Sequence, residues 1–328
     1  MALDARLGQM ALFSHFRPAE LRELAAIGVG RAYPAETTVL RQGDLTHDAY
    51  VVDRGLVEVQ RKTPYGQFTL AQLGNGHLFG EASFIDAATR SGDAVTRTAA
   101  ELLAFPFAAT RELMERDPRI AAALYWSFWK SLSSKLRRTN DQLTRFFAHV
   151  PHPPATMPAE TRPATGEFRL DIREKRELFA EQKLSPMEIN FLTTLSRERK
   201  LKPGQVLFQE GDPGDAMYVV LEGRILISKF IPGAGEEALA FLDRGDYFGE
   251  MALIDGAPRS AQARAHERGA VVLAIPGEVV TGILDVRKVS SLPLLKILCA
   301  LVTKRLRELD DKIVGWYILA GGEAPSSI

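Results

Sequence analysis

Two stretches of the chain alternate apolar and polar positions with a period of about two residues. The first contains the runs DAYVVDRG, LVEVQRK and QFTLAQL, and the second contains AMYVVLEG, RILISKF and EALAFL. Gly, Pro and Asp turn signals separate these runs, and no helix-length apolar pattern interrupts them. The pattern predicts an antiparallel β-roll or barrel in each stretch.

A helical period follows each predicted roll. Apolar residues recur at spacings of three and four from Leu132 to Phe146, and again from Val302 to Trp316. The two helices also correspond in sequence, as SKLRRTNDQL and KRLRELDDKI. Such seams suit either homodimer coiled coils or helices that fold back as lids within the chain, and the pattern does not choose between these arrangements.

The chain contains an internal repeat. TVLRQGDLTHDAYVVDRGLVEV (38–59) matches QVLFQEGDPGDAMYVVLEGRILI (205–227), with Gly43 aligned to Gly211. HLFGEASFIDAATRSGDA (77–94) then matches YFGEMALIDGAPRSAQA with the register shifted by one residue. We therefore expect one hairpin loop to differ by one residue between the two copies.

The repeat predicts a mainly β fold with flanking helices, in which two tandem jelly-roll-like β-rolls are each followed by a long helix. The expected division is a first domain at 1–147, a Pro-rich linker at 148–167, a second domain at 168–320 and a tail at 321–328. The segment HVPHPPATMPAETRPATGE is typical of an extended, semi-rigid linker. An ordered clasp between the domains is the alternative.

Composition limits the class of protein. A chain of 328 residues has length for about two domains. Lys plus Arg and Asp plus Glu number 41 each, so no global field favours nucleic acid or an anionic membrane. The single cysteine, Cys299, has no partner for an intrachain disulfide. With no secretory signal pattern at the amino terminus and no apolar run long enough for a bilayer, we expect a cytoplasmic protein.

The segment FGEMALIDGAPRSAQ (248–262) is the main candidate site. A glycine before Glu250 permits a tight turn, and the following MALI can form one helical turn with free N–H groups. Arg259 presents fork-like donors to a phosphate, while Glu250 suits the hydroxyl groups of a ribose. Phosphate joined to ribose in a compact ring is a cyclic nucleotide. A surface salt bridge between Glu250 and Arg259 is the alternative reading.

These residues resemble the phosphate-binding cassette of cyclic nucleotide-binding domains. The family includes the catabolite activator protein, regulatory subunits of cyclic AMP-dependent protein kinase and nucleotide-gated channels. The resemblance implies that the glutamate binds the ribose 2′-hydroxyl and that the arginine binds the cyclic phosphate. The ligand-binding residues that it implies for the second site are Gly249, Glu250, Met251, Ala252, Arg259, Ser260 and Ala261.

The first copy keeps both charges but departs from the pattern around them. Thr89 replaces the proline and Gly92 replaces the alanine of the second copy, and both changes are expected to loosen the backbone that positions the arginine. The alternative is a relic of the fold in which the glutamate and arginine pair with each other. The residues implied for the first site are Gly80, Glu81, Ala82, Ser83, Arg90 and Ser91.

Candidate base contacts lie on the helices that follow the rolls. Thr139 and Asn140 stand where the helix of the catabolite activator protein carries a polar pair that touches adenine, although they also suit a packed helix seam. In the second copy Trp316 or Tyr317 is a candidate to stack on a purine, although aromatics at helical spacing are also typical of a core. The serine after each arginine favours cyclic AMP over cyclic GMP by resemblance.

The sequence also bears on whether the protein binds DNA, catalyses a reaction or regulates a partner. GWYILAGGEAPSSI after the second helix is too short for a helix-turn-helix domain, so direct DNA binding is not expected. No catalytic constellation, metal-ligand spacing or cofactor motif is evident, so an enzyme is not expected. The predicted function is a cyclic nucleotide receptor that couples binding to helix rearrangement and regulates an unidentified effector protein. The alternative is a scaffold without ligand, and a homodimer through the C-terminal helices stays open.

Overall fold

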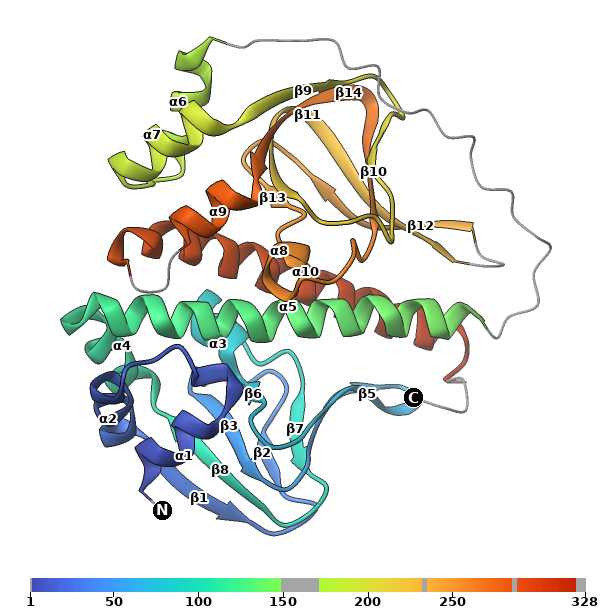
Figure 1. Cartoon of the computed structure of the whole chain (residues 1–328). Helices are drawn as coiled ribbons and strands as arrows, with labels where there is room; N and C mark the ends of the chain where they lie inside the picture. The colour runs from blue at the N-terminus through green and yellow to red at the C-terminus, as the bar shows by residue number, and fades with distance from the viewer. Residues whose placement is uncertain (1, 149–170, 232–234, 285–287, 323–328) are drawn as a thin grey trace. The chain divides into compact units, whose positions relative to one another are not determined.

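The computed structural model describes residues 2–148, 171–231, 235–284 and 288–322 (Figure 1). The chain divides into two compact units. The first joins Met1–Thr139 with Val286–Ser326, and the second is built on Asn140–Asp285. No helix in the described ranges is long and apolar enough to cross a bilayer.

The roll of the first unit consists of two antiparallel sheets with the strand orders β1-β8-β3-β6 and β2-β7-β4-β5. Its core lies between the sheets and includes the fully buried Val52, Val57 and Leu73. The strands are β1 (Val29–Tyr33), β2 (Thr38–Leu40), β3 (Ala49–Arg54), β4 (Val57–Thr63), β5 (Gly66–Leu73), β6 (Leu78–Phe79), β7 (Asp93–Thr96) and β8 (Ala100–Phe105).

The roll of the second unit repeats this plan with longer strands. β11 and β14 each run through both halves of the roll and carry register shifts where they bend, so the sheet is continuous in the order β10-β14-β11-β12. β13 also pairs with β11, and β9 with β14. The strands are β9 (Arg197–Leu201), β10 (Val206–Phe208), β11 (Ala216–Ile231), β12 (Gly235–Leu242), β13 (Tyr247–Phe248) and β14 (Gln262–Pro276).

The hairpins confirm the predicted slip in register between the copies. In the first roll Thr63 pairs with Gly66, whereas in the second Ile231 pairs with Gly235, which adds one residue to the connection. A register shift also falls at the same place in both hairpins, after Val59 in β4 and after its repeat equivalent in β11.

Helices flank both rolls, as the sequence predicts for a mainly β fold. A short helix follows the glycine of each cassette, and a longer helix follows the last strand of each roll. The first copy has α1 (Leu3–Gln9), α2 (Pro18–Ile27), α3 (Glu81–Asp86), α4 (Phe107–Arg116) and α5 (Pro118–Ala148). The second copy has α6 (Ile172–Glu181), α7 (Pro186–Leu195), α8 (Met251–Asp255), α9 (Gly277–Ile283) and α10 (Leu292–Leu319).

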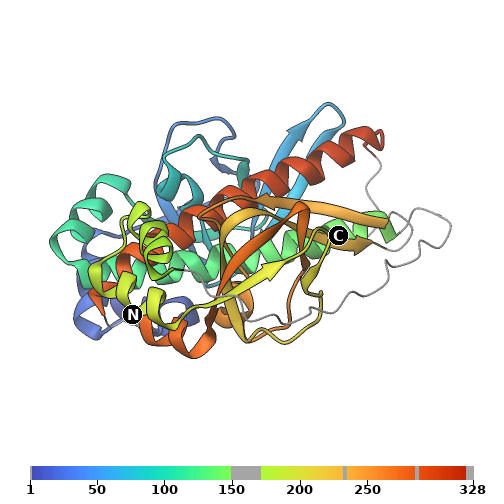
Figure 2. The ribbon, with the colours of Figure 1, turned by 90° about the horizontal axis from the view of Figure 1, so that it is seen from above.

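The last helix, α10, belongs to the first compact unit, although it follows the second roll in sequence. The Cys299 thiol donates to the backbone oxygen of Tyr125 on α5 at 3.2 Å. The rings of Tyr317 and Phe68 lie 4.9 Å apart, which places the end of α10 on strand β5 (Figure 2). Of the two arrangements open to the helical seams, α10 therefore shows the one folded back within the chain.

This packing differs from the expected division, which assigned α10 to a second domain at 168–320. The amphipathic pattern specifies an apolar face but not the surface that covers it, and here the first unit covers it. The predicted linker lies almost wholly in residues 149–170, outside the described ranges, as does the tail from residue 323.

Candidate ligand-binding sites

A glycine with a left-handed backbone precedes the cassette glutamate in each roll. The φ angles are 80° at Gly80 and 77° at Gly249. A Cβ atom would lie 2.8 Å from Nη1 of Arg90 at the first position and 2.7 Å from Nη1 of Arg259 at the second. Both the conformation and the lack of space require glycine, because the guanidinium group packs directly against this backbone.

Backbone carbonyl groups hold Arg90 in the first roll. Its Nη1 donates to the oxygen of Gly80 at 2.8 Å, and its Nη2 donates to the oxygen of Asp48 at 2.7 Å. Its Nε donates to the hydroxyl of Thr46 at 3.0 Å. Burial lowers the pKa of Arg90, but a guanidinium stays protonated at neutral pH. A fixed, buried positive charge therefore lies beside α3.

Arg259 repeats this arrangement in the second roll. Its Nη1 donates to the oxygen of Gly249 at 2.6 Å, and its Nη2 donates to the oxygen of Ala216 at 2.7 Å. The guanidinium carbon lies 4.4 Å from the ring centre of Phe208, a cation–π contact. Burial lowers the pKa of this arginine as well. The two cassettes thus fix their arginines through equivalent carbonyl groups, but Nε of Arg90 donates to Thr46, whereas Nε of Arg259 is buried with no hydrogen-bond partner among the described residues.

The cassette glutamates are also buried, with 1% of Glu81 and 2% of Glu250 exposed. Glu81 accepts hydrogen bonds from the hydroxyl of Ser131 at 2.8 Å and from Nζ of Lys135 at 2.5 Å, both on α5. Glu81 and Arg90 therefore have separate partners, and the alternative in which they pair with each other is not the arrangement found. A buried carboxylate connects α5 to the cassette of the first roll.

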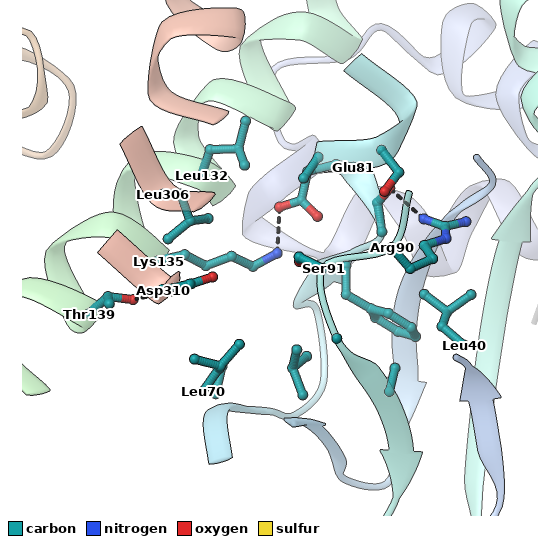
Figure 3. A pocket seen from close by; sticks show the side chains of 18 of the residues that line it. Leu40, Leu70, Glu81, Arg90, Ser91, Leu132, Lys135, Thr139, Leu306 and Asp310 are labelled. Atoms are coloured by element: carbon teal, nitrogen blue, oxygen red, sulfur yellow. Dashed lines mark hydrogen bonds and ion pairs between the residues drawn. The ribbon is translucent and has the colours of Figure 1, made fainter. Parts of the chain in front are cut away.

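A cavity in the first unit opens between α3, the sheet, α5 and α10 (Figure 3). It holds about 730 Å³ of empty space, including solvent at its mouth. The lining includes every residue that the sequence assigns to the first site, namely Gly80, Glu81, Ala82, Ser83, Arg90 and Ser91.

The side of the cavity across from Arg90 is formed by α5 and α10. Leu306 and Asp310 of α10 line it together with Thr139 of α5 (Figure 3). The Thr139 hydroxyl donates to a carboxyl oxygen of Asp310 at 3.4 Å. Burial raises the pKa of Asp310 to about 7, against the opposing effects of Arg61 and the Thr139 hydrogen bond. A titratable group therefore faces the cavity across from the fixed cation.

The candidate base contacts are placed differently by the structure. Thr139 lines the cavity, whereas Asn140, also buried, is not among its described lining residues. For the second site the sequence offers Trp316 or Tyr317 as candidates to stack on a purine, with packing in a core as the alternative. The structure instead buries the Tyr317 ring against Phe68 of the first roll, because α10 packs within the first unit, and leaves Trp316 half-buried on the same helix.

Arg307 of α10 contacts the cassette of the first roll directly. Its guanidinium forms two hydrogen bonds with the carboxylate of Asp86, at 2.6 and 3.1 Å. It also donates to the backbone oxygen of Thr89 at 3.1 Å and to the hydroxyl of Ser83 at 3.3 Å. The side chains that sequence reasoning missed at the first site are Ser131, Lys135, Leu306, Arg307 and Asp310. Each lies on a helix whose packing partner the sequence did not specify.

A sequence model of the cyclic nucleotide-binding domain matches residues 30–117 and 198–286. Each match covers one roll. Within the described ranges, no group of three or more His, Cys, Asp or Glu side chains is placed to hold a metal ion. Each of the two matched regions contains one arginine and glutamate cassette.

Two similar curated proteins have names that refer to cyclic AMP. The cAMP-dependent protein kinase regulatory subunit of Dictyostelium discoideum is 25% identical over 263 residues, covering 79% of this chain and 66% of that protein. The cyclic AMP receptor protein of Thermus thermophilus is 35% identical over 128 residues, covering 39% of this chain and 56% of that protein. The chain thus spans less than two thirds of the length of either protein.

Among solved structures, the regulatory domain of Toxoplasma gondii PKA co-crystallised with cAMP covers 96% of both chains, with 19% identity and a TM-score of 0.33. A cyclic nucleotide-binding domain from Methylobacillus flagellatus covers 44% of this chain and 82% of its own, with 23% identity and a TM-score of 0.40.

Proposed function

The chain belongs to the cyclic nucleotide-binding domain family, and on this premise we propose that it is a receptor for cyclic nucleotides, with cyclic AMP favoured. The observation that carries the proposal is the repeated cassette. Each roll holds a buried arginine against the carbonyl group of a left-handed glycine, and a buried glutamate follows that glycine.

The chemistry of the first cassette suits the ribose and phosphate of such a ligand. Arg90 uses one hydrogen on each of its three nitrogens within the protein, which leaves a second hydrogen on Nη1 and on Nη2. Two remaining donors suit the two exocyclic oxygens of a cyclic phosphate. The carboxylate of Glu81 accepts only, and it suits the 2′-hydroxyl of the ribose.

Cyclic AMP is favoured on two grounds. The serine that follows each cassette arginine resembles the residue at this position in bacterial cyclic AMP receptors. The two similar proteins described above have names that refer to cyclic AMP, although a cGMP-dependent protein kinase of Toxoplasma gondii also matches, at 35% identity over 101 residues. Cyclic GMP is the competing ligand, since its phosphate and ribose are the same.

Binding at the first site would act on both long helices. A ribose hydroxyl at Glu81 competes with Lys135 of α5 for the same carboxylate. Arg307 carries any movement of α3 to α10 through Asp86. A ligand shifts this arrangement only by its differential affinity for the two states. We propose that the moved helices change a surface seen by an effector protein, as the name of the kinase regulatory subunit suggests for that relative.

Isothermal titration of the full chain with cyclic AMP and cyclic GMP tests the proposal. Arg90→Ala and Arg259→Ala should each remove one binding step, because truncating one member of a buried charge pair costs roughly 2–5 kcal/mol. Such a loss weakens binding at least about thirtyfold. Arg54→Ala and Arg224→Ala are matched controls on the two rolls, since these side chains are 75% and 50% exposed.

Two outcomes would reject the receptor. In the first, neither nucleotide gives heat in the titration and neither raises the unfolding temperature. Any ligand of the native state would stabilise it by mass action. The other is equal loss of binding in the control variants and the cassette variants. Either result would favour the scaffold.

A further inference from the structure

We infer that Thr46 is a positioning residue of the first site, in which its hydroxyl group turns the guanidinium of Arg90 toward the ligand phosphate. The inference rests on the proposed function, because it takes that phosphate to be bound by Arg90. It deepens the function by assigning different supports to the two cassette arginines, a hydroxyl group in the first roll and an aromatic ring in the second.

The backbone of the cassette arginine is held in the same way in both rolls. The amide of Arg90 donates to the oxygen of Asp44 at 3.0 Å, and the amide of Gly43 donates to the oxygen of Arg90 at 3.0 Å. The two corresponding bonds of Arg259 both measure 2.9 Å. The terminal nitrogens of both guanidinium groups also have equivalent carbonyl partners. Hydrogen bonding of the two arginines therefore differs at Nε.

The Thr46 hydroxyl completes the anchoring of Arg90. It accepts a hydrogen bond from Nε at 3.0 Å, while Nη1 and Nη2 donate to carbonyl oxygens at 2.8 and 2.7 Å. The guanidinium is planar, and contacts at all three of its nitrogens fix its plane as well as its position. The hydrogens left for a ligand, one on Nη1 and one on Nη2, therefore point in fixed directions.

The second roll has no room for a hydroxyl at the corresponding position. Gly214 aligns with Thr46 in the repeat, and a Cβ atom there would lie 2.2 Å from Cβ of Ala252. Nε of Arg259 is buried, and no hydrogen-bond partner for it is found among the described residues. The ring of Phe208 lies against this guanidinium, with the ring centre 4.4 Å from the guanidinium carbon.

The first roll lacks that ring. Leu40 aligns with Phe208 in the repeat and lines the first cavity, but its aliphatic side chain offers no cation–π contact. Thr46 therefore supplies in the first roll the orientation that Phe208 supplies in the second.

Loss of the Thr46 hydroxyl is expected to weaken phosphate binding. Nε would lose its acceptor and the guanidinium could turn, so its two remaining donors would face the phosphate oxygens for less of the time. Hydrogen bonds of charged groups are among the stronger ones, which sets the expected loss of affinity at about tenfold. Cyclic AMP and cyclic GMP carry the same phosphate, so both affinities should fall by the same factor.

The test measures affinities for cyclic AMP and cyclic GMP by titration calorimetry in the full chain carrying Arg259→Ala, so that the first site is observed alone. Arg259→Gln is a second background if the alanine variant does not fold. Thr46→Val should weaken both nucleotides about tenfold, whereas Thr46→Ser keeps the hydroxyl and should stay within about twofold of the parent. Leu45→Ala is the matched control on the same loop, since Leu45 is 74% exposed, and it should leave both affinities unchanged.

A spectroscopic measurement separates orientation of the guanidinium from packing of the loop. In nitrogen-15 spectra, the Nε–H signal of Arg90 is the one that Arg90→Lys removes. Its exchange with solvent should become at least about tenfold faster in Thr46→Val and stay unchanged in Thr46→Ser, because the hydrogen bond protects it.

The second roll provides the reciprocal comparison. In a protein carrying Arg90→Ala, Phe208→Leu introduces the residue of the first copy and should weaken binding at the second site about fivefold, since the cation–π contact is lost. Thr46→Val should have no effect on affinity in the same background.

Equal losses of affinity in Thr46→Val and Thr46→Ser would assign the effect to packing of the loop. Faster exchange of Nε–H with unchanged affinities would show that this orientation does not govern binding. Either result overturns the inference and leaves the receptor intact. Absence of binding by either nucleotide in both Arg259 backgrounds, with Arg90→Ala still binding at the second site, would refute ligand binding at the first site and the inference with it.

Discussion

Arg307 on α10 and Asp86 at the end of α3 form a two-point ion pair in which the N–O distances are 2.6 and 3.1 Å. The two residues are 221 positions apart in sequence. About a quarter or less of each side chain is exposed. The pair therefore connects the ligand cassette of the first roll to a helix made from the other end of the chain.

We expect Arg307→Ala and Asp86→Ala to destabilise the first unit through the same interaction. In a double-mutant cycle, the coupling free energy should be about 1 kcal/mol, since both groups are partly buried and the pair is bidentate. Urea unfolding of the single and double variants measures it. The pair Lys304 and Glu308, exposed and 3.9 Å apart, should show a coupling closer to about 0.3 kcal/mol. Equal coupling in both pairs would contradict the prediction.

The cassette glycines give a second prediction. Gly80→Ala and Gly249→Ala should each weaken nucleotide binding at their own site by about tenfold or more, because the new methyl group displaces the guanidinium. Gly43→Ala and Gly211→Ala are matched controls, since these glycines also have positive φ but no atom within 4 Å of the added carbon.

These controls should lower stability by about 1–2 kcal/mol through backbone strain and leave affinity unchanged. Titration calorimetry separates the two effects. An equal loss of affinity in all four variants would mean that strain alone, and not contact with the arginine, determines the result.

Asp310 makes the stability of the first unit depend on pH. Its pKa is about 7 in the folded state against a usual value of 3.8. The folded state thus holds a proton that the unfolded state has lost between these values, and the free energy of unfolding falls as pH rises through this window. Once Asp310 is ionised in both states, the free energy of unfolding has fallen by about 4 kcal/mol in total.

Asp310→Asn should therefore gain stability over the parent protein as pH rises from about 5 to about 8. Urea unfolding of both proteins at the two pH values provides the comparison, with Glu308→Gln as the exposed control. A difference between parent and variant that does not change with pH would show that Asp310 is ionised throughout.

Cys299 offers a probe of α10. Burial raises the pKa of its thiol well above the usual value, and the thiol donates to Tyr125 on α5. We expect labelling by a thiol reagent to require the release of α10 and to be at least about tenfold slower than in the unfolded chain. Cyclic AMP at about 100 times its Kd should slow labelling by about a further hundredfold, because a ligand bound in the cavity that α3 and α10 line stabilises the state in which α10 is packed on the first unit.

The Arg90→Ala variant should lack this further effect of ligand. Rapid labelling in the presence of nucleotide would mean that binding releases α10, and the predicted direction of the rearrangement would be wrong.

Local and repetitive features of the fold were predictable from the sequence. The alternating runs predicted the rolls, and the slip in register predicted the extra residue between Ile231 and Gly235. The glycine and arginine spacing predicted which residues would gather around α3, since a left-handed glycine and a charged fork have few other uses in this pattern.

The contribution of α10 to the first site was not predictable. The apolar stripe of α10 shows that one face is covered, but it is compatible with either roll or with a second chain. Asp310 aligns with Asn140 in the repeat, so the sequence places it on the helix that follows the second roll and gives no sign that it lines the first site. The ion pair of Arg307 with Asp86 depends on the packing of α10, and the buried pair of Lys135 with Glu81 depends on the packing of α5 against α3, so both became visible only in the structure.

The return of α10 to the first unit also sets the order in which the molecule can be assembled during translation. A ribosome produces the first roll and α5 more than a hundred residues before it produces α10, since α5 ends at Ala148 and α10 begins at Leu292. Until then the nascent first unit lacks Arg307 beside Asp86 and lacks Asp310 in its cavity. The second roll, though later in the chain, can therefore finish folding on the ribosome before the first unit is complete.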